Sequence, residues 1–389
     1  MRYQSSIFRQ ILKPLSQRSV GDIAARHNAS AYDKKFRFWD HLVAMIYAQL
    51  AHAQSLREIE AAWNANSHQH YHLGTGPVAR ATLADANKRR PVEAFAEVFT
   101  KLSAEAGRTL RRECAEMVRI IDSSPIPLHE TVACRTSNGR INGAKLHTVY
   151  DAATGCPCQV DITAANVNDI EIGKTAAIEN GMTLVFDKGY CSYHWWSEIH
   201  DKSAFFVTRL KTNARVQKLK KRALTADERQ GCGFIVTEDV EIKLIYMRNP
   251  KLDLPVRRIR VKRESGGYLT LITNDMKRTA VEVANLYKAR WQIELLFRWI
   301  KQHLNLKTFL GRSENAIKLQ IYAAMIAYLL LQLAARASSL KHTAIRFAEL
   351  AGRALFIRKP MVRLDKPPEV NPSKAKPKPP SNQIELNYA

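Results

Sequence analysis

Two short β-branched runs in the middle of the chain each end at an aspartate. The run MVRII, Met117 to Ile121, precedes Asp122, and the run TLVF, Thr183 to Phe186, precedes Asp187. A helix is predicted before the second run, from Asp169 to Ile178, which gives the order strand, helix, strand. Open α/β sheets carry ligand-binding and catalytic groups at their strand tips. The two aspartates are therefore predicted to lie at strand tips of one mixed sheet.

Strand patterns continue on both sides of this pair. Residues 145–150 and 159–163 are short β-branched runs that join the same predicted sheet. Residues 203–276 contain several more strand-like runs, ending with YLTLIT, and helical patterns return near residue 280. We expect an α/β core of residues 113–202 and 277–356 that is interrupted by an all-β insertion at 203–276.

The two ends of the chain differ from this middle part. Apolar spacing predicts helices at Phe36 to Ala51, Ser55 to Trp63 and Pro91 to Ala106. We therefore expect an all-helical N-terminal domain at 1–75 and a helical connector at 76–112. Residues 358–389 combine prolines with lysines, a composition that buries little, and are predicted to form a disordered basic tail.

Charge is the unusual feature of the composition. Lys and Arg number 60 against 36 Asp and Glu, a net charge of +24, whereas the hydrophobic content of 46% is ordinary for a folded chain. This balance favours a polyanionic partner, most commonly nucleic acid. The six cysteines lack the density of a secreted framework, and the first twenty residues contain no uninterrupted apolar run, so a reducing cytoplasm is expected. The apolar run Ile321 to Leu331 is short for a membrane span and is predicted to be a buried helix.

A late helix carries a second cluster of functional side chains. In the segment Asn285 to Lys307, an ideal wheel of about 100° per residue places Arg290, Glu294 and Lys301 within about 40° of one another, next to Tyr287. The apolar positions lie on a separate stripe: Ala289, Ile293, Leu296, Ile300 and Leu304. The polar stripe is either a surface row of i,i+4 ion pairs or a functional face.

The carboxylates suggest metal chemistry. Asp122, Asp187 and Glu294 could supply the oxygen ligands that Mg²⁺ prefers. Two such ions stabilise the attacking and leaving oxygens of a phosphoryl displacement, which suits a basic chain. Structural alternatives remain open, because Asp122 could begin an Asx turn and Asp187 could cap the helix that starts near Tyr193.

Several spaced residues resemble one family of enzymes. Tyr287, Arg290, Glu294 and Lys301 follow the pattern Y-x2-R-x3-E-x6-K, and the chain resembles the bacterial insertion-sequence transposases defined by it, the insertion-sequence-four family. The sequence DKGY at Asp187 resembles that family's D-x-G-[YF] block, and IDSS around Asp122 resembles its first block. The stretch KFRFWDHLVAMIYAQLAHAQSLREIE resembles the N-terminal domain of one branch, so the resemblance covers about residues 5 to 350.

The resemblance implies a DNA transposase with an RNase H-like catalytic domain. Asp122, Asp187 and Glu294 would form the triad that binds two Mg²⁺ or Mn²⁺ ions. The implied reaction is cut-and-paste movement: the enzyme binds terminal inverted repeats, cleaves the element ends by hydrolysis, and joins the freed 3′-hydroxyls to target DNA. The implied partners are double-stranded DNA, of the ends and of the target, and a second copy of the chain in a synaptic complex at the nucleoid.

The resemblance also assigns DNA contacts. Tyr287, Arg290 and Lys301 would hold phosphates near the scissile bond, and Arg298 shares their stripe. In relatives an aromatic residue of the insertion stacks on a flipped base. Tyr268 is the nearest candidate here, although a tryptophan is expected at that position. The alternative role for Tyr268 is that of a residue on the face of the β-sheet. The basic run Arg209 to Arg222 is either a solvated loop or a DNA-tracking segment.

Two other functions fit the same sequence. An RNase H-like nuclease or resolvase would keep the triad but act without paired element ends. A DNA-binding repressor derived from a transposase would bind DNA without cleaving it, and the complete set of three acids disfavours this alternative.

Overall fold

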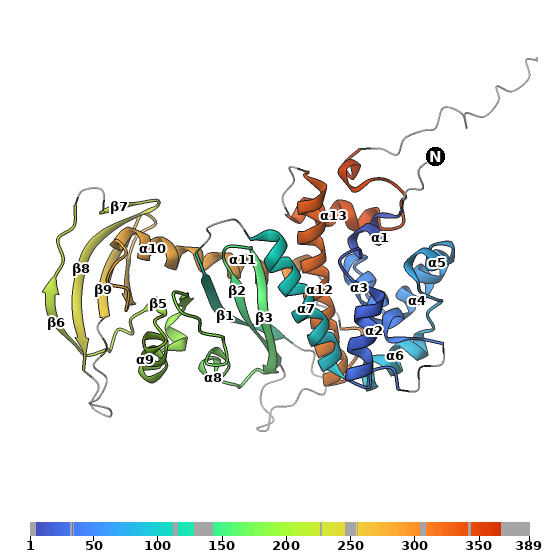
Figure 1. The fold of residues 1–389 in the computed structure, drawn as a ribbon, viewed down its shortest axis with the longest axis horizontal. Helices are drawn as coiled ribbons and strands as arrows, with labels where there is room; N and C mark the ends of the chain where they lie inside the picture. Colours follow the sequence, from blue (N-terminus) through green and yellow to red (C-terminus); the bar gives the residue numbers. More distant parts are fainter. Residues whose placement is uncertain are drawn as a thin grey trace, which may run out of the picture.

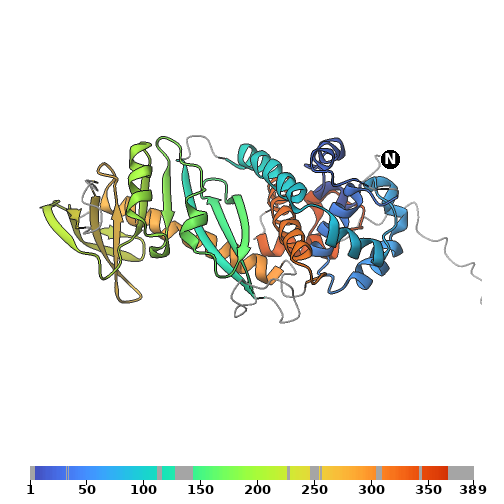
Figure 2. The ribbon, with the colours of Figure 1, turned by 90° about the horizontal axis from the view of Figure 1, so that it is seen from below.

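The computed structural model describes residues 5–366 apart from 32, 34, 112–115, 128–142, 226–227, 246–253, 255, 304–308 and 341–343. Figure 1 shows an elongated molecule, with the N-terminal helices at one end, the sheet core in the middle and the inserted strands at the other end. Figure 2, turned by 90°, shows the same separation of the two ends. The predicted fold class, a mixed α/β core with a β insertion and an all-helical N-terminal part, is confirmed.

The N-terminal helices surround one buried helix. Their bounds are α1 Ile7–Ile11, α2 Gln17–Arg26, α3 Phe38–Leu50, α4 Leu56–Ala65, α5 His70–Leu73 and α6 Arg80–Arg89, with a 3₁₀ turn η1 at Ser67–Gln69. Every residue of α3 is buried. Ser55 caps α4, because its hydroxyl accepts a hydrogen bond from the amide of Glu58 at 3.2 Å.

Two long helices join this unit to the sheet: α7, Val92–Leu110, and α12, Glu314–Ser338. They pack against each other and against strand β3, Cys156–Ala164, and α12 also packs against α3. Among the described helices α12 alone is long and apolar enough to cross a membrane, but 89% of its most apolar window is buried inside the fold. The prediction of a buried apolar helix in this region is confirmed.

The core sheet mixes antiparallel and parallel pairs. Its strands are β1 Val118–Pro127, β2 Gly143–Asp151, β3, β4 Thr183–Phe186 and β5 Phe205–Arg209, in the order β3-β2-β1-β4-β5. The first three strands are antiparallel neighbours, whereas β4 and β5 run parallel to β1. The boundary between core and insertion differs from the prediction here, because β5 was assigned to the insertion but pairs with β4.

The inserted strands extend the same sheet. β10, Tyr268–Thr273, pairs with β5, and the order continues through β9 Val256–Arg263 and β8 Phe234–Leu244 to β6 Val216–Lys221, with the short β7 Gln230–Gly231 beside β8. All these pairs are antiparallel. Strand β6 lies within the basic run 209–222, which the sequence did not predict to be a strand.

Helices cover both faces of the core sheet. On one face lie α8 Asp169–Gly173 and α9 Tyr193–Asp201, where Trp195 and Trp196 pack on Phe186 and Phe206 with ring centroids 4.8 and 5.0 Å apart. The other face carries α10 Ala280–Ala289 and α11 Trp291–His303. The single helix predicted from 285 to 307 is therefore two helices, which meet at Arg290, and residues 304–308, including Leu304, lie outside the described residues.

The C-terminal segment is ordered further than predicted. After α13, Ala344–Arg353, the chain forms a β-bridge between Arg358 and Ser6 and a 3₁₀ turn η3 at Met361–Arg363. Lys359 is buried, and its ammonium donates to the carbonyl of Leu364 at 2.9 Å. Disorder was predicted from residue 358, and this is wrong for 358–366, because the side-chain amide of Gln10 donates to the carbonyl of Lys359 and accepts from the amide of Met361, which ties the segment to α1. Residues 367–389 lie outside the described part.

Candidate active site

The register of two parallel strands brings the aspartates together. Ile121 of β1 lies opposite Phe186 of β4, and Asp122 and Asp187 are the next residues of each strand. Side chains alternate along strands, so both carboxylates project to the face opposite Ile121 and Phe186. That is the face on which α10 approaches β4 and α11 approaches β1.

The two aspartates occupy different local positions. Asp187 directly follows β4, as predicted, whereas β1 continues to Pro127, so Asp122 lies inside its strand and not at the tip. Asp187 does not cap α9, because the hydroxyl of Ser192 does so by accepting from the amide of Trp195. The carboxylate of Asp122 accepts a hydrogen bond from the amide of Ser123 at 2.9 Å. The backbone of Asp122 is nevertheless paired with Thr148 of β2, so Asp122 does not begin an Asx turn.

Helix α11 brings the third acid to the strands through an arginine. The guanidinium of Arg290 donates from Nη1 to Asp122 Oδ2 at 2.8 Å and from Nη2 to Glu294 Oε1 at 2.5 Å. The i,i+4 ion pair between Arg290 and Glu294 is therefore present, as the surface alternative proposed. It is not an ordinary surface pair, however, because the same guanidinium reaches across to β1.

The other members of the polar stripe also meet the strands. Tyr287 donates its hydroxyl to Asp187 Oδ1 at 3.1 Å, and Lys301 donates its ammonium to the hydroxyl of Ser124 at 2.7 Å. Ser124 follows Asp122 by two residues, so both point to the same face of β1. The structure thus brings together the predicted Asp122, Asp187, Glu294, Tyr287, Arg290 and Lys301.

A further arginine completes the charge balance around Asp187. Arg209, at the end of β5, places its Nη1 3.6 Å from Asp187 Oδ1. In the sequence, Arg209 stands out only as the start of a basic run, and its position beside the aspartate was not predicted. The parallel pairing of β5 with β4, which sets this contact, has no signal in the local sequence.

Burial and crowding of acids shape the protonation of the site. Burial, with smaller contributions from Asp187 and Glu294, raises the pKa of Asp122 from 3.8 to about 6, although the Ser123 amide and Arg290 oppose the rise. Burial raises the pKa of Tyr287 to about 12 and lowers the pKa of Lys301. Tyr287 is therefore a neutral hydrogen-bond donor at pH 7.

The three acids have the donor chemistry of a divalent metal site but not its assembled geometry. Carboxylate oxygens are the ligands that Mg²⁺ and Mn²⁺ take. Within the described residues no group of three His, Cys, Asp or Glu side chains is arranged to hold a metal ion. The geometry gives the reason, because Arg290 lies between Asp122 and Glu294 and hydrogen-bonds to both.

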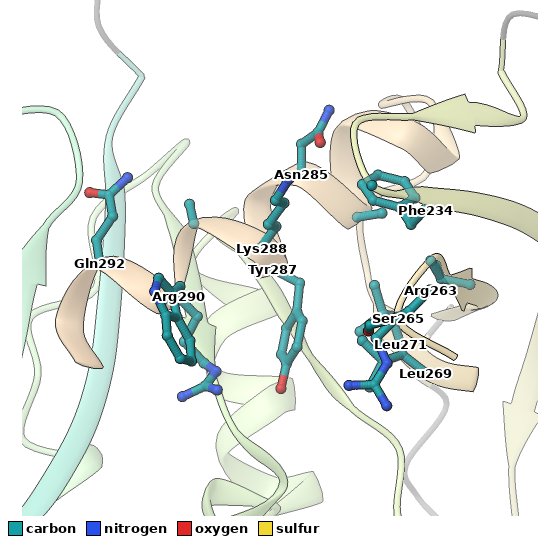
Figure 3. Close-up of a pocket in the computed structure, with 15 residues that line it drawn as sticks. Phe234, Arg263, Ser265, Leu269, Leu271, Asn285, Tyr287, Lys288, Arg290 and Gln292 are labelled. Atoms are coloured by element: carbon teal, nitrogen blue, oxygen red, sulfur yellow. The ribbon is translucent and has the colours of Figure 1, made fainter. Parts of the chain in front are cut away.

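A cavity of about 600 Å³ opens beside this cluster, between the inserted strands and the junction of α10 with α11. Figure 3 shows Tyr287 and Arg290 on one side of this junction, with Leu269 and Leu271 of β10 facing them across the space. Trp291 also lines the cavity and is 51% exposed. Trp291 was not predicted as a site residue, although it falls at about 40° from Tyr287 on the helical wheel, well off the apolar stripe.

Two predicted DNA contacts lie elsewhere. Arg298 is exposed, and its guanidinium lies over the Trp291 ring, 5.6 Å from the centroid. Tyr268 is 52% exposed and pairs with Lys262, with Arg260 stacked 4.4 Å from its ring centroid. Tyr268 alternates with Leu269, so it faces the side of the sheet opposite the cavity. Tyr268 therefore does not lie near the carboxylates, and it is an exposed residue on the face of the sheet.

Comparison with known proteins places this cluster in a family. A family model described as a transposase DDE domain matches residues 113–330, which contain all three acids, and a domain of unknown function matches residues 3–76. The chain belongs to the DDE transposase family. The N-terminal match begins and ends close to the helical domain predicted at 1–75.

Individual relatives of this DDE transposase have corresponding names. A Sinorhizobium fredii protein named as the transposase y4zB is 50% identical over 306 residues, which are 79% of this chain and 85% of that protein. A Geobacillus stearothermophilus protein named as the transposase for insertion sequence element IS5377 is 25% identical over 65% of this chain and 66% of its own length. A Synechocystis protein named as the transposase for element IS4SA is 28% identical, over 65% and 71% respectively.

One solved structure has a distant likeness. The piggyBac transposase synaptic complex with hairpin DNA covers 94% of this chain and 81% of that chain, with a TM-score of 0.44 and 10% identity. The function of this DDE transposase is to bind, cut and join DNA with the help of divalent metal ions, as its family membership shows.

Proposed function

We propose that this transposase moves an insertion sequence by cut-and-paste, with Asp122, Asp187 and Glu294 as its catalytic metal ligands. The observation that supports this most strongly is the convergence of the three acids, which come from β1, β4 and α11, on one face of the sheet. When bound, two Mg²⁺ or Mn²⁺ ions would activate the attacking oxygen and stabilise the leaving oxygen of an in-line displacement.

The residues around the acids would hold the DNA strand. Lys301 and Arg209 offer cations, Tyr287 offers a neutral hydroxyl donor, and Arg290 offers a planar fork for a phosphate. Trp291 presents an exposed aromatic face at the rim of the cavity, which suits stacking on a base. Arg298, whose guanidinium stacks on Trp291, would reach the neighbouring backbone.

More distant contacts would follow from the layout of the chain. The helical domain at 1–75 would bind the terminal inverted repeat, and the basic run 209–222, which includes the exposed Lys218 and Lys220 of β6, would track phosphates along the insertion. Tyr268 and Arg260 would touch DNA on the opposite side of the sheet from the cleaved strand. Two copies of the chain would assemble with two ends into a synaptic complex, at the nucleoid in the cytoplasm.

A plasmid assay separates this proposal from its alternatives. Supercoiled plasmids carrying two, one or no copies of the inverted repeat that flanks the gene are incubated with the protein and Mg²⁺. A transposase cleaves at the repeats and requires two of them, whereas a nuclease cuts plasmids with one repeat equally well, and a repressor binds without cutting.

Variants then test the assignment of the acids. Asp187→Asn and Glu294→Gln should abolish cleavage while repeat binding persists, because each removes one proposed metal ligand. Asp161→Asn is the matched control, since Asp161 lies on β3 and accepts a hydrogen bond from Gln159 at 2.9 Å, away from the cluster. Cleavage at the wild-type rate by either acid variant would remove that residue from the site.

A further inference from the structure

Arg290 makes two contacts that a metal ligand set would replace. Its Nη1 donates to Asp122 and its Nη2 donates to Glu294, at 2.8 and 2.5 Å. Both carboxylates therefore direct an oxygen at one guanidinium. A divalent cation would need lone pairs of these same two acids, so the guanidinium and the cation compete for them.

The surroundings of Arg290 leave it a second place to bind. Its Nε is buried and has no hydrogen-bond partner among the residues that the structure describes. Its guanidinium also lies 5.6 Å from the Tyr287 ring centroid, and it lines the open cavity beside α10 and α11. Once its Nη groups leave the carboxylates, an arginine that lines an open cavity is suited to take a phosphate, because phosphate binds a guanidinium through two parallel hydrogen bonds.

We propose that Arg290 is a positioning residue that couples metal binding to DNA binding. In the DNA-free protein its guanidinium holds Asp122 and Glu294 and blocks their use as joint metal ligands. When the strand to be cleaved enters, a phosphate binds Arg290, and the two acids are released to the metal. This rests on the function proposed above, and it adds that the metal site is assembled by the substrate.

Thermodynamic linkage makes the coupling measurable in both directions. If DNA raises the affinity for the metal by some factor, the metal raises the affinity for DNA by the same factor. The probe is Mn²⁺, whose free concentration is followed by electron paramagnetic resonance, and the DNA is a duplex carrying the flanking inverted repeat. Binding of that duplex is followed independently by fluorescence anisotropy.

Three variants of the full chain are compared with wild type in the absence of DNA. Arg290→Gln removes the charge and the fork, whereas Arg290→Lys keeps the charge but cannot hold both acids with separate nitrogens of one planar group. Arg258→Gln is the control, because Arg258 is an arginine of similar exposure, 17% against 18%, that pairs with Glu238 in the insertion. Circular dichroism checks that each variant folds.

The expected result is that Arg290→Gln and Arg290→Lys each bind Mn²⁺ about tenfold more tightly than wild type without DNA. DNA should tighten Mn²⁺ binding by a similar factor in wild type and by less in both variants, while Arg258→Gln behaves as wild type. If Arg290→Gln does not fold, Arg290→Lys decides the question alone.

Two results would overturn the coupling. One is a wild-type Mn²⁺ affinity in Arg290→Lys, which would mean that holding both acids does not matter. The other is a wild-type protein that binds the duplex with no change in Mn²⁺ affinity. Absence of duplex binding would instead reject the proposed function, and the comparison without DNA would still stand as a separate test of Arg290.

Discussion

Asp122→Asn should make the metal-free protein more stable at neutral pH. Burial first, and then Asp187 and Glu294, raise the pKa of Asp122 to about 6, above its unfolded value of 3.8. A raised folded-state pKa means that the folded protein holds the proton more tightly than the unfolded chain does. The stability that this proton confers is fully present below about pH 4 and is lost as the pH rises through about 6.

The size of the effect follows from the shift. The difference between about 6 and 3.8 is about 2.2 pKa units, which at about 1.36 kcal/mol per unit gives about 3 kcal/mol. The side chain is only 19% exposed, so solvent screening does not remove most of this. Asn does not titrate, so the free energy of unfolding of the variant relative to wild type should rise by up to about 3 kcal/mol between about pH 4 and pH 8.

The assay is urea denaturation of both proteins across this pH range with a metal chelator present. Asp275→Asn is a control of opposite sign. Burial of Asp275 acts to raise its pKa, but other groups outweigh burial and lower the pKa. These groups are the amides of Lys277 and Arg278, which donate hydrogen bonds to the carboxylate, and the guanidinium of Arg278. That variant should therefore be less stable at neutral pH and recover relative to wild type in acid. A stability difference for Asp122→Asn that stays constant with pH would refute the electrostatic explanation.

Three other outcomes are expected. Lys301→Ala should slow cleavage at least about tenfold, which corresponds to about 1.4 kcal/mol for one lost phosphate contact. Gln302→Ala is the control and should change the rate little, because Gln302 is exposed one position along α11. Equal small effects of the two substitutions would make Lys301 an ordinary surface residue. The logarithm of repeat affinity should fall with the logarithm of salt at a slope of about −5 to −9 for about six to ten phosphate contacts, and a slope near zero would exclude phosphate-dominated binding. The rate of cleavage at limiting Mg²⁺ should decline below about pH 6, because a protonated Asp122 is a poor metal ligand. A cleavage rate that stays constant down to about pH 5 would argue against Asp122 as a ligand.

Local patterns sufficed for the elements that carry the site. The runs before Asp122 and Asp187 formed β1 and β4 because buried parallel strands are short and rich in branched residues, and the stripe of α11 faced β1 because its apolar side is buried. The roles of the site residues stay predictions until cleavage is measured.

Other features depend on contacts between distant segments. The run that forms β5 has the same apolar pattern as an inserted strand, and only its pairing with β4 makes it a core strand. The break at Arg290 has no proline or glycine to announce it, and the turn is closed by i→i+3 bonds, from Arg290 to Tyr287 and from Ile293 to Arg290. The order of residues 358–366 comes from the bridge between Arg358 and Ser6 and from the hydrogen bonds of the Gln10 side chain, which a local composition argument does not contain.

The position of α12 has a consequence for the evolution of such genes. This catalytic-domain helix is covered on one side by α3 and α1. Helix α1 is in turn held in place by the backbone pairing of residues 6–8 with residues 355–358. A gene copy that has lost its codons up to the end of α6 would encode a chain in which the side of α12 that packs on α1, α3 and α6 is exposed to water, and such an apolar patch promotes aggregation. Shortened copies would thus yield insoluble debris instead of dominant inhibitors that occupy repeats or pair with intact subunits.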